Sequence, residues 1–323
     1  MSATLFIDGK WRASSDGATW NVLSPADGHL VATVAEATVA DVQDAIAAAR
    51  NAFDNSDFPN LGFDKRSALV GKIADLIERD LKVLAKLESD DTGKRLIEAE
   101  YDIADVIACF RHFEELGKKQ HERVVNVGME HIDSRVVHEA VGVCSLIGPW
   151  NYPLLQISWK IAPALVAGCT MVVKPSELTP STAIYLFKLM EEAGVPKGVV
   201  NLVLGKGANI GDALTGDPRV DLVSFTGGLN TGKRIMGIAA QSVKKVALEL
   251  GGKNPNIIFA DSDVDAAIDN AVTAGFLHSG QVCSAGTRLV VEKSIHDKVV
   301  NEIVRRAKDI KLGGPSSAEA ETG

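Results

Sequence analysis

Cysteine is scarce in this chain of 323 residues, and the four present, Cys109, Cys144, Cys169 and Cys283, lie far apart. None belongs to a Cys-x-x-Cys pair or to a cysteine–histidine spacing typical of zinc, so we predict free thiols and no metal site. The first three lie in apolar runs, where cysteine behaves as a small buried hydrophobe. Cys283 differs, because it follows a Gly-Gln-Val segment.

An excess of positive charge is also lacking. Lysine and arginine number 34 against 42 aspartates and glutamates, a formal net charge of -8. This balance provides no electrostatic footprint for nucleic acid or an anionic membrane, so we expect neither as a partner. The sequence has no apolar run of the roughly 20 residues that a membrane span needs, and no signal-like start. We therefore expect a cytoplasmic protein.

The composition is that of a folded protein, with 46% hydrophobic and 24% charged residues. At roughly 100–200 residues per domain, the length suggests about two domains. Apolar residues recur every three or four positions within residues 39–53, 69–77 and 96–119, which predicts three amphipathic helices.

Further along the chain, short apolar runs alternate with helical stretches. The runs lie at residues 141–147, 170–174, 199–203 and 222–225. Buried strands that alternate with helices predict an α/β fold with a Rossmann-like parallel sheet, whose ligands bind at the carboxyl ends of the strands. Before these runs, β-type residues around two turns predict an inserted two-stranded β-ribbon over residues 123–141.

A second α/β series begins near Asn254. It has predicted strands at residues 256–259 and 289–291 and predicted helices over 264–276 and 296–308, and a polar tail follows. Two strands alone would keep an open edge and bury little area. We therefore predict only the start of a second α/β domain.

Two side chains are candidates for a catalytic role, and each also has a simpler structural interpretation. Glu249 lies among apolar residues just before a glycine pair, where partial desolvation would raise its pKa towards that of a general base. Cys283 lies where a helical pattern ends, so that its sulfur can face a cleft. Taken alone, such a glutamate is more often a surface residue and such a cysteine is more often buried and inert.

Other motifs favour the catalytic interpretation of Glu249 and Cys283. The segments 149–153 (PWNYP), 173–177 (VKPSE) and 225–228 (FTGG) occur in order with the segments around Glu249 and Cys283. Together they closely resemble the NAD(P)-dependent aldehyde dehydrogenase superfamily along the whole chain. Within it, the sequence is most similar to the betaine aldehyde dehydrogenase branch.

The resemblance implies a catalytic set. Cys283 would be the nucleophile whose thiolate attacks the aldehyde carbon. The side-chain amide of Asn151, beside the Cys283 backbone N–H, would stabilise the oxyanion. Glu249 would activate the water that hydrolyses the thioester after hydride transfer to NAD.

The resemblance also implies cofactor contacts. Lys174 and Glu177 match the ribose contacts, and the Glu177 carboxylate would repel a 2′-phosphate, so we expect NAD rather than NADP. The Gly-x-x-x-x-Gly turn at residues 227–232 would admit the pyrophosphate. The other implied contacts are Ile147, Trp150, Ser176, Gly207, Gly211, Phe225, Gly227, Gly228, Gly232 and Leu250.

The substrate is implied less directly. Tyr152 and Trp159 match two positions of an aromatic box that holds a trimethylammonium group in plant members of this branch. Leu277 stands where a third aromatic residue is expected, and the fourth position lies beyond residue 323. Packing of the helix after Asn151 explains Tyr152 and Trp159 equally well.

The resemblance divides the chain into parts. Residues 1–122 and 142–252 would form an NAD-binding domain, residues 123–141 an oligomerisation ribbon, and residues 253–323 the N-terminal part of a catalytic domain. The family continues beyond this point, so we interpret the chain as an N-terminal fragment and expect the 323-residue chain alone to be inactive. The full-length family is expected to form homodimers or homotetramers.

Two other functions remain open. The chain could be a catalytically inactive dinucleotide-binding fragment, or a thiol esterase that works without NAD through Cys283, Asn151 and Glu249. A CoA-acylating enzyme is disfavoured, because acyl transfer to CoA does not need a water-activating base.

Overall fold

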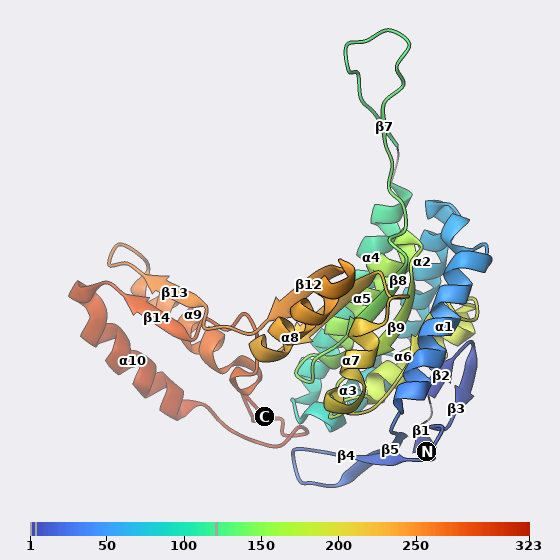
Figure 1. The fold of residues 1–323 in the computed structure, drawn as a ribbon. Helices are drawn as coiled ribbons and strands as arrows, with labels where there is room; N and C mark the ends of the chain where they lie inside the picture. The colour runs from blue at the N-terminus through green and yellow to red at the C-terminus, as the bar shows by residue number, and fades with distance from the viewer. Residues whose placement is uncertain (1, 4, 120–121) are drawn as a thin grey trace.

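The computed structural model describes residues 2–3, 5–119 and 122–323. Residues 1, 4, 120 and 121 of the predicted NAD-binding domain lie outside the described residues. Figure 1 shows a large body, a long ribbon that projects from it, and a smaller unit made of the orange and red end of the chain. The α/β fold predicted from the sequence is confirmed.

A seven-stranded sheet organises the described part of the large body, with the order β12-β11-β8-β9-β10-β2-β3. Strands β8 to β12 run parallel to one another, whereas β2 and β3 are antiparallel additions next to β10. Strands β8 and β9 are buried along their whole length, which explains their continuous apolar runs. The strands are β2 (Leu5–Ile7), β3 (Lys10–Arg12), β8 (Val143–Ile147), β9 (Thr170–Lys174), β10 (Val200–Leu202), β11 (Leu222–Gly227) and β12 (Lys245–Leu250).

Helices cover both faces of this sheet. Helices α1, α7 and α8 lie against one face, and α5 and α6, backed by α2, α3 and α4, lie against the other. The helices are α1 (Val39–Asn55), α2 (Phe63–Arg79), α3 (Leu81–Thr92), α4 (Leu96–Lys118), α5 (Pro153–Ala167), α6 (Ser181–Ala193), α7 (Gly207–Gly216) and α8 (Leu229–Ala239).

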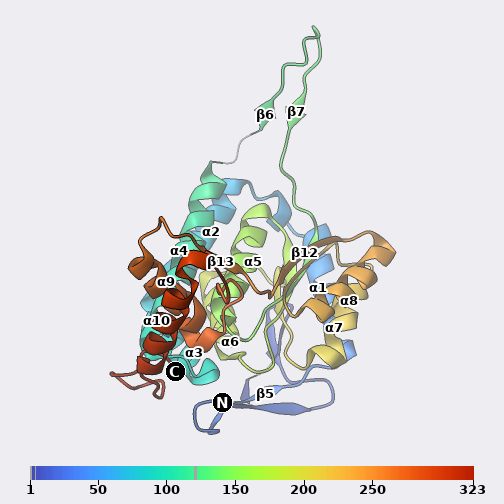
Figure 2. The same ribbon diagram turned by 90° about the vertical axis from the view of Figure 1, so that its left-hand side faces the viewer.

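Smaller sheets surround the body. Strands β1 (Ser2–Ala3), β5 (Leu30–Ala35) and β4 (Thr19–Leu23) form a three-stranded sheet. Strands β6 (Arg123–Val124) and β7 (Arg135–Val136) pair in the projecting ribbon (Figure 2). In the smaller unit, β13 (Pro255–Ile258) and β14 (Arg288–Val291) pair in parallel, beside α9 (Val264–Phe276) and α10 (His296–Asp309).

The apolar core is divided in the same way. One large cluster of buried side chains fills the space between the seven-stranded sheet and its helices. A separate small cluster, made of Ile258, Ile268, Ala271 and Val299, lies in the smaller unit. Across the described ranges, no helix is both long enough and apolar enough to cross a membrane.

The order of the strands determines where a ligand can bind. From β8 the chain continues to β9 and β10 on one side, and β11 and β12 lie on the other side of β8. Such a reversal of strand order opens a crevice at the carboxyl ends of the strands. The crevice here is expected between the ends of β8 and β11.

Candidate active site

A cleft of about 910 Å³ lies at this reversal point. Its wall is built from the carboxyl ends of β8, β9 and β11, the first turns of α7 and α8, and the loop of residues 280–283. The sequence-predicted residues that line it are Ile147, Trp150, Asn151, Lys174, Ser176, Glu177, Gly207, Gly211, Phe225, Gly227, Gly228 and Cys283.

The first turns of α7 and α8 offer backbone N–H groups to the cleft. Their N-cap residues, Lys206 and Gly228, make no side-chain capping hydrogen bond. A Cβ atom built on Gly207 or Gly228 would meet no other atom within 4 Å, so the backbone there borders open space. Free first-turn N–H groups and the helix dipole favour a negatively charged ligand group at this position.

Lys174 and Glu177 form a pair at the end of β9. The Lys174 ammonium is buried and lies 3.4 Å from the Glu177 carboxylate, which is half-buried. Burial lowers the pKa of Lys174, and Glu177 opposes this change. The Glu177 carboxylate therefore borders the cleft, next to the buried ammonium of Lys174.

Asn151 is bound to the loop that carries Cys283, and both residues line the cleft. The Asn151 amide nitrogen donates to the Gln281 carbonyl at 2.8 Å, two residues before Cys283. The Asn254 side chain donates to the Cys283 carbonyl at 2.8 Å, which holds the same loop from the other side. The Cys283 side chain is exposed and borders the cleft. A thiol and an amide donor thus border the same cleft, with the amide bound two residues before the thiol.

All four cysteines are free, as predicted. Cys144 and Cys169 are buried in the large core. The prediction for Cys109 was too simple, because it lies on α4 with its side chain only half-buried.

The chain matches the family model described as aldehyde dehydrogenase family over residues 11–323. It belongs to the aldehyde dehydrogenase family. Betaine aldehyde dehydrogenase of Bacillus subtilis (strain 168) is 53% identical over all of this chain and 66% of its own length. Human retinal dehydrogenase 2 is 42% identical over 99% of this chain and 62% of its own length.

A solved structure of betaine aldehyde dehydrogenase from Staphylococcus aureus in complex with NAD+ superposes with a TM-score of 0.97 at 47% identity. The match covers 99% of this chain and 64% of that one. The chain thus spans about two thirds of the length of the aldehyde dehydrogenases that it matches.

In this aldehyde dehydrogenase chain, Glu249 is exposed, which corrects the prediction of a desolvated carboxylate. It lies on β12, the edge strand of the seven-stranded sheet, and within the described residues no strand pairs with the outer edge of β12. Glu249 pairs in register with Thr226 and shares the sheet face that packs on α5, where Lys160 bonds Ser224. It therefore approaches the site from the α5 side and is outside the wall of the main cleft.

Gly232 and Leu250 are likewise outside the cleft wall. Leu250 follows Glu249 on β12 and so points to the opposite face, towards α8. A Cβ atom on Gly232 would lie 2.8 Å from the Leu250 Cδ2 atom. These two residues set how closely α8 packs on β12.

The two aromatic residues of the predicted substrate box lie apart from the main cleft wall. Tyr152 packs against His278, with ring centroids 5.1 Å apart, and against the Lys94 ammonium, 4.3 Å from its ring centroid. Trp159 is half-exposed and lines a second cavity of about 290 Å³ next to Lys160.

Lys160 was not predicted from the sequence as a site residue. Its ammonium donates to the Ser224 hydroxyl at 3.0 Å, and burial lowers its pKa to about 8, while the negative charge of Glu249 opposes this change. Asp212 and Thr215 were also missed, although they continue the helical spacing of Gly207 and Gly211 along the cleft side of α7.

Proposed function

We propose that this aldehyde dehydrogenase chain carries the machinery for NAD-dependent oxidation of an aldehyde to a carboxylic acid. The supporting observation is the shared cleft, which is lined by Cys283 and Asn151 and by the uncapped first turns of α7 and α8. NAD fits this cleft, because its pyrophosphate can approach the backbone at Gly207 and Gly228, where no Cβ atom fills the space. When bound, NAD supplies the hydride acceptor.

The Cys283 thiolate would attack the aldehyde carbon and form a carbon–sulfur bond, which converts the carbonyl oxygen into an oxyanion. The Asn151 amide would donate a hydrogen bond to that oxygen. Loss of hydride from the same carbon leaves a thioester on Cys283. Water then adds to the thioester, its proton passes to Glu249, and the carboxylic acid leaves as the Cys283 thiolate is restored.

We further propose that Lys160 supports Glu249 in the hydrolytic step. Both side chains lie on the α5 side of the sheet, and the charge of Glu249 acts on the ammonium of Lys160. An exposed glutamate on an edge strand can reach water without opening the fold. If water reaches the thioester from the α5 side of the sheet, the dinucleotide can stay bound in the main cleft during hydrolysis.

NAD is the proposed cofactor in preference to NADP. The half-buried Glu177 beside buried Lys174 supports this choice, because its carboxylate can accept ribose hydroxyl hydrogens and repels a 2′-phosphate. The S. aureus structure in complex with NAD+ also supports it.

Betaine aldehyde or another aminoaldehyde is the proposed substrate. The similarity to the B. subtilis and S. aureus betaine aldehyde dehydrogenases supports this class. Lys94 already occupies one face of Tyr152, so a cationic substrate would have to use the other face of that ring.

We propose residues 123–141 as an oligomerisation ribbon between the two parts of an NAD-binding domain, with residues 253–323 opening a catalytic domain. The ribbon projects from the body and exposes Val124, Met129 and Ile132, which would be buried against another subunit of a homodimer or homotetramer (Figure 2).

The test compares the wild-type chain with Cys283→Ala and with the matched control Cys144→Ala. In whichever form of the protein oxidises aldehydes, we expect NADH absorbance from aldehyde and NAD with the wild type and the control, and a loss of at least a thousandfold in Cys283→Ala. NAD binding, measured by calorimetry, should stay within about twofold in all three. Binding without turnover in the wild type would identify a dinucleotide-binding chain only, and ester hydrolysis without NAD would favour a thiol esterase.

A further inference from the structure

A buried lysine lies behind the candidate active site. Lys94 is 2% exposed, and it occupies the turn between α3 and α4. Its backbone is fixed on both sides, because its N–H donates to the Thr92 hydroxyl at 3.3 Å and its carbonyl accepts from the Ser89 hydroxyl at 2.7 Å. A buried ammonium costs several kcal/mol unless charged and polar partners surround it.

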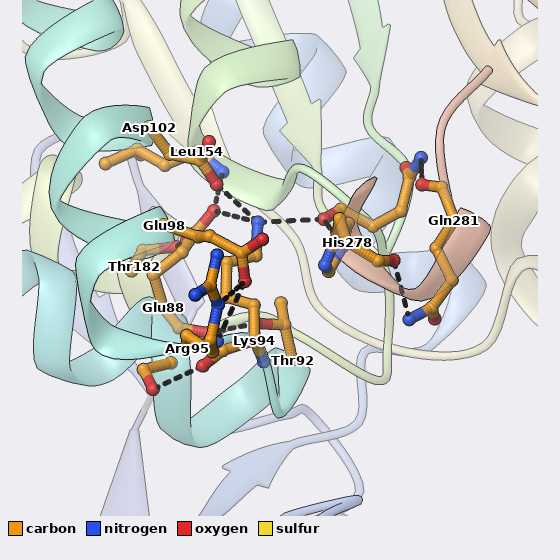
Figure 3. A network of polar contacts seen from close by, with 12 residues as sticks. Glu88, Thr92, Lys94, Arg95, Glu98, Asp102, Leu154, Thr182, His278 and Gln281 are labelled. Atoms are coloured by element: carbon orange, nitrogen blue, oxygen red, sulfur yellow. Dashed lines mark hydrogen bonds and ion pairs between the residues drawn. The ribbon is translucent and has the colours of Figure 1, made fainter. Parts of the chain in front are cut away.

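The partners of the ammonium come from three elements (Figure 3). It forms an ion pair with Asp102 of α4, and Glu88 of α3 lies 4.0 Å away. Its remaining hydrogen bond, of 3.0 Å, goes to the Asn151 carbonyl, in the segment between β8 and α5. The buried cation therefore links the α3–α4 turn directly to the proposed oxyanion donor.

A second donor reaches the same carbonyl from the cysteine loop. The His278 Nε2 atom lies 2.9 Å from the Asn151 carbonyl oxygen. A carbonyl only accepts, so His278 donates through Nε2–H. Burial, followed by the nearby Lys94 charge, lowers the pKa of His278 to about 4, so this ring is neutral at physiological pH.

His278 is also tied to Cys283. Its own carbonyl accepts the Gln281 backbone N–H at 3.0 Å, which closes a turn two residues before Cys283. The Gln281 carbonyl accepts the Asn151 side-chain amide at 2.8 Å. Asn151 is thus held at both ends, and since an amide nitrogen carries two hydrogens, one is left for a substrate oxygen.

We propose that Lys94 and His278 are positioning residues, which clamp the Asn151 carbonyl and thereby aim its side-chain amide at the reacting carbon beside Cys283. The proposal rests on the proposed function, in which that amide stabilises an oxyanion. A donor displaced by about 1 Å loses much of its effect on a transition state. Neither residue touches the substrate.

A direct test observes Asn151 itself and needs no turnover. The dipeptide Asn-Tyr occurs once in the sequence, at residues 151–152. Labelling with carbonyl-¹³C asparagine and ¹⁵N tyrosine therefore gives one carbonyl–amide NMR correlation, from this peptide bond. The side-chain amide signal of Asn151, in ¹⁵N-asparagine protein, is assigned by its loss in Asn151→Ala.

We expect Lys94→Met to shift both signals, and His278→Leu to do the same if Lys94→Met fails to fold. Lys244→Met is the matched control, because the Lys244 ammonium also binds backbone carbonyls, those of Asp217 and Val220 at 2.5 and 2.7 Å, before the start of β11. It should leave both signals in place. An unchanged Asn151 side-chain signal in Lys94→Met and His278→Leu would overturn the proposal.

Kinetics then separate positioning from general stability. We expect Asn151→Ala to lower kcat for aldehyde oxidation by about 10²–10³, and Lys94→Met to lower it about tenfold with NAD binding unchanged. In the Asn151→Ala background, Lys94→Met should cost less than twofold. A full tenfold loss in that background would contradict positioning through Asn151. If Asn151→Ala leaves kcat unchanged, the proposed function fails, while the NMR signals still decide whether Lys94 holds Asn151.

Discussion

Two buried carboxylates on α3 reach the N-termini of other helices. Glu88 accepts from the Thr182 hydroxyl at 2.8 Å and from the Leu154 N–H at 3.4 Å. Asp91 accepts from both the N–H and the hydroxyl of Ser181, each at 2.8 Å. First-turn N–H groups have no partner within their own helix, so these carboxylates satisfy them. Burial raises the pKa of both carboxyl groups to about 7.

This pKa leads to a prediction for Asp91→Asn. An acid whose folded pKa is raised above its unfolded value contributes stability at low pH and loses it as the pH rises towards the folded pKa. Asparagine keeps an acceptor for Ser181 and does not titrate. The free energy of unfolding of Asp91→Asn relative to wild type should therefore increase by about 1–3 kcal/mol from pH 5 to pH 7. Urea titrations at several pH values measure it, and a constant difference would contradict the raised pKa.

The single substitution Glu249→Gln tests the proposed general base. Glutamine keeps the shape and removes the proton acceptor, so thioester hydrolysis should slow by at least tenfold while hydride transfer stays fast. Rapid mixing with aldehyde and NAD should show a burst of NADH followed by a slow phase. An equal loss in both phases would show that Glu249 has no special part in deacylation.

At the scale of elements, glycines end helices α3 and α6, which pack against each other. Gly93 follows α3 with φ of 74°, and Gly194 follows α6 with φ of 86°. Both adopt the left-handed conformation that closes a helix at low cost only for glycine. A Cβ atom on Gly93 would lie 2.9 Å from Pro25 Cγ, whereas one on Gly194 would meet nothing within 4 Å. Gly93 thus serves both the helix end and the close approach of the N-terminal segment.

We therefore predict that Gly93→Ala is more destabilising than Gly194→Ala. The left-handed backbone should cost roughly 1–2 kcal/mol in each variant. The contact with Pro25 should add about 1 kcal/mol in Gly93→Ala alone. Chemical denaturation measures both changes, and equal losses would mean that the Pro25 segment moves aside freely.

At the scale of the whole molecule, the two units have very different cores. The large cluster joins the main sheet to helices on both faces, whereas the cluster of Ile258, Ile268, Ala271 and Val299 is small. Around the small cluster, Ile257, Phe259 and Val290 are exposed. Ordering the backbone costs roughly 1–2 kcal/mol per residue, which a small core hardly offsets.

Hydrogen exchange on the 323-residue chain should reflect this difference. We predict strong protection across residues 141–225 and weak protection across residues 256–311, because local opening costs least where few apolar side chains are buried. Mass spectrometry of peptic fragments after exchange measures both regions in one experiment. Uniform protection would show that the smaller unit shares the stability of the main body.

The sequence by itself determined the local hydrophobic periodicity, and with it several helices and strands. Alternating apolar runs and helical patterns predicted strands β8 to β11 and the bounds of α9. A strand buried on both faces has a continuous apolar run, and a helix buried along one stripe has apolar residues every three or four positions, so both can be recognised from neighbouring residues. The edge strand β12 was not predicted, and its alternating residues are only half-covered. Motif residues at strand ends were predicted to share one site, and the cleft brings Asn151, Lys174, Phe225 and Cys283 together.

Only the tertiary structure decided which distant residues meet. Lys94 and His278 are 57 and 127 positions from Asn151, and no period in the sequence relates them. Glu249 has the apolar neighbours of a buried residue, yet it is exposed on the edge strand β12. Periodicity reports which face of an element is apolar, whereas the partner of that face, and the charges that must be buried with it, depend on how the whole chain packs.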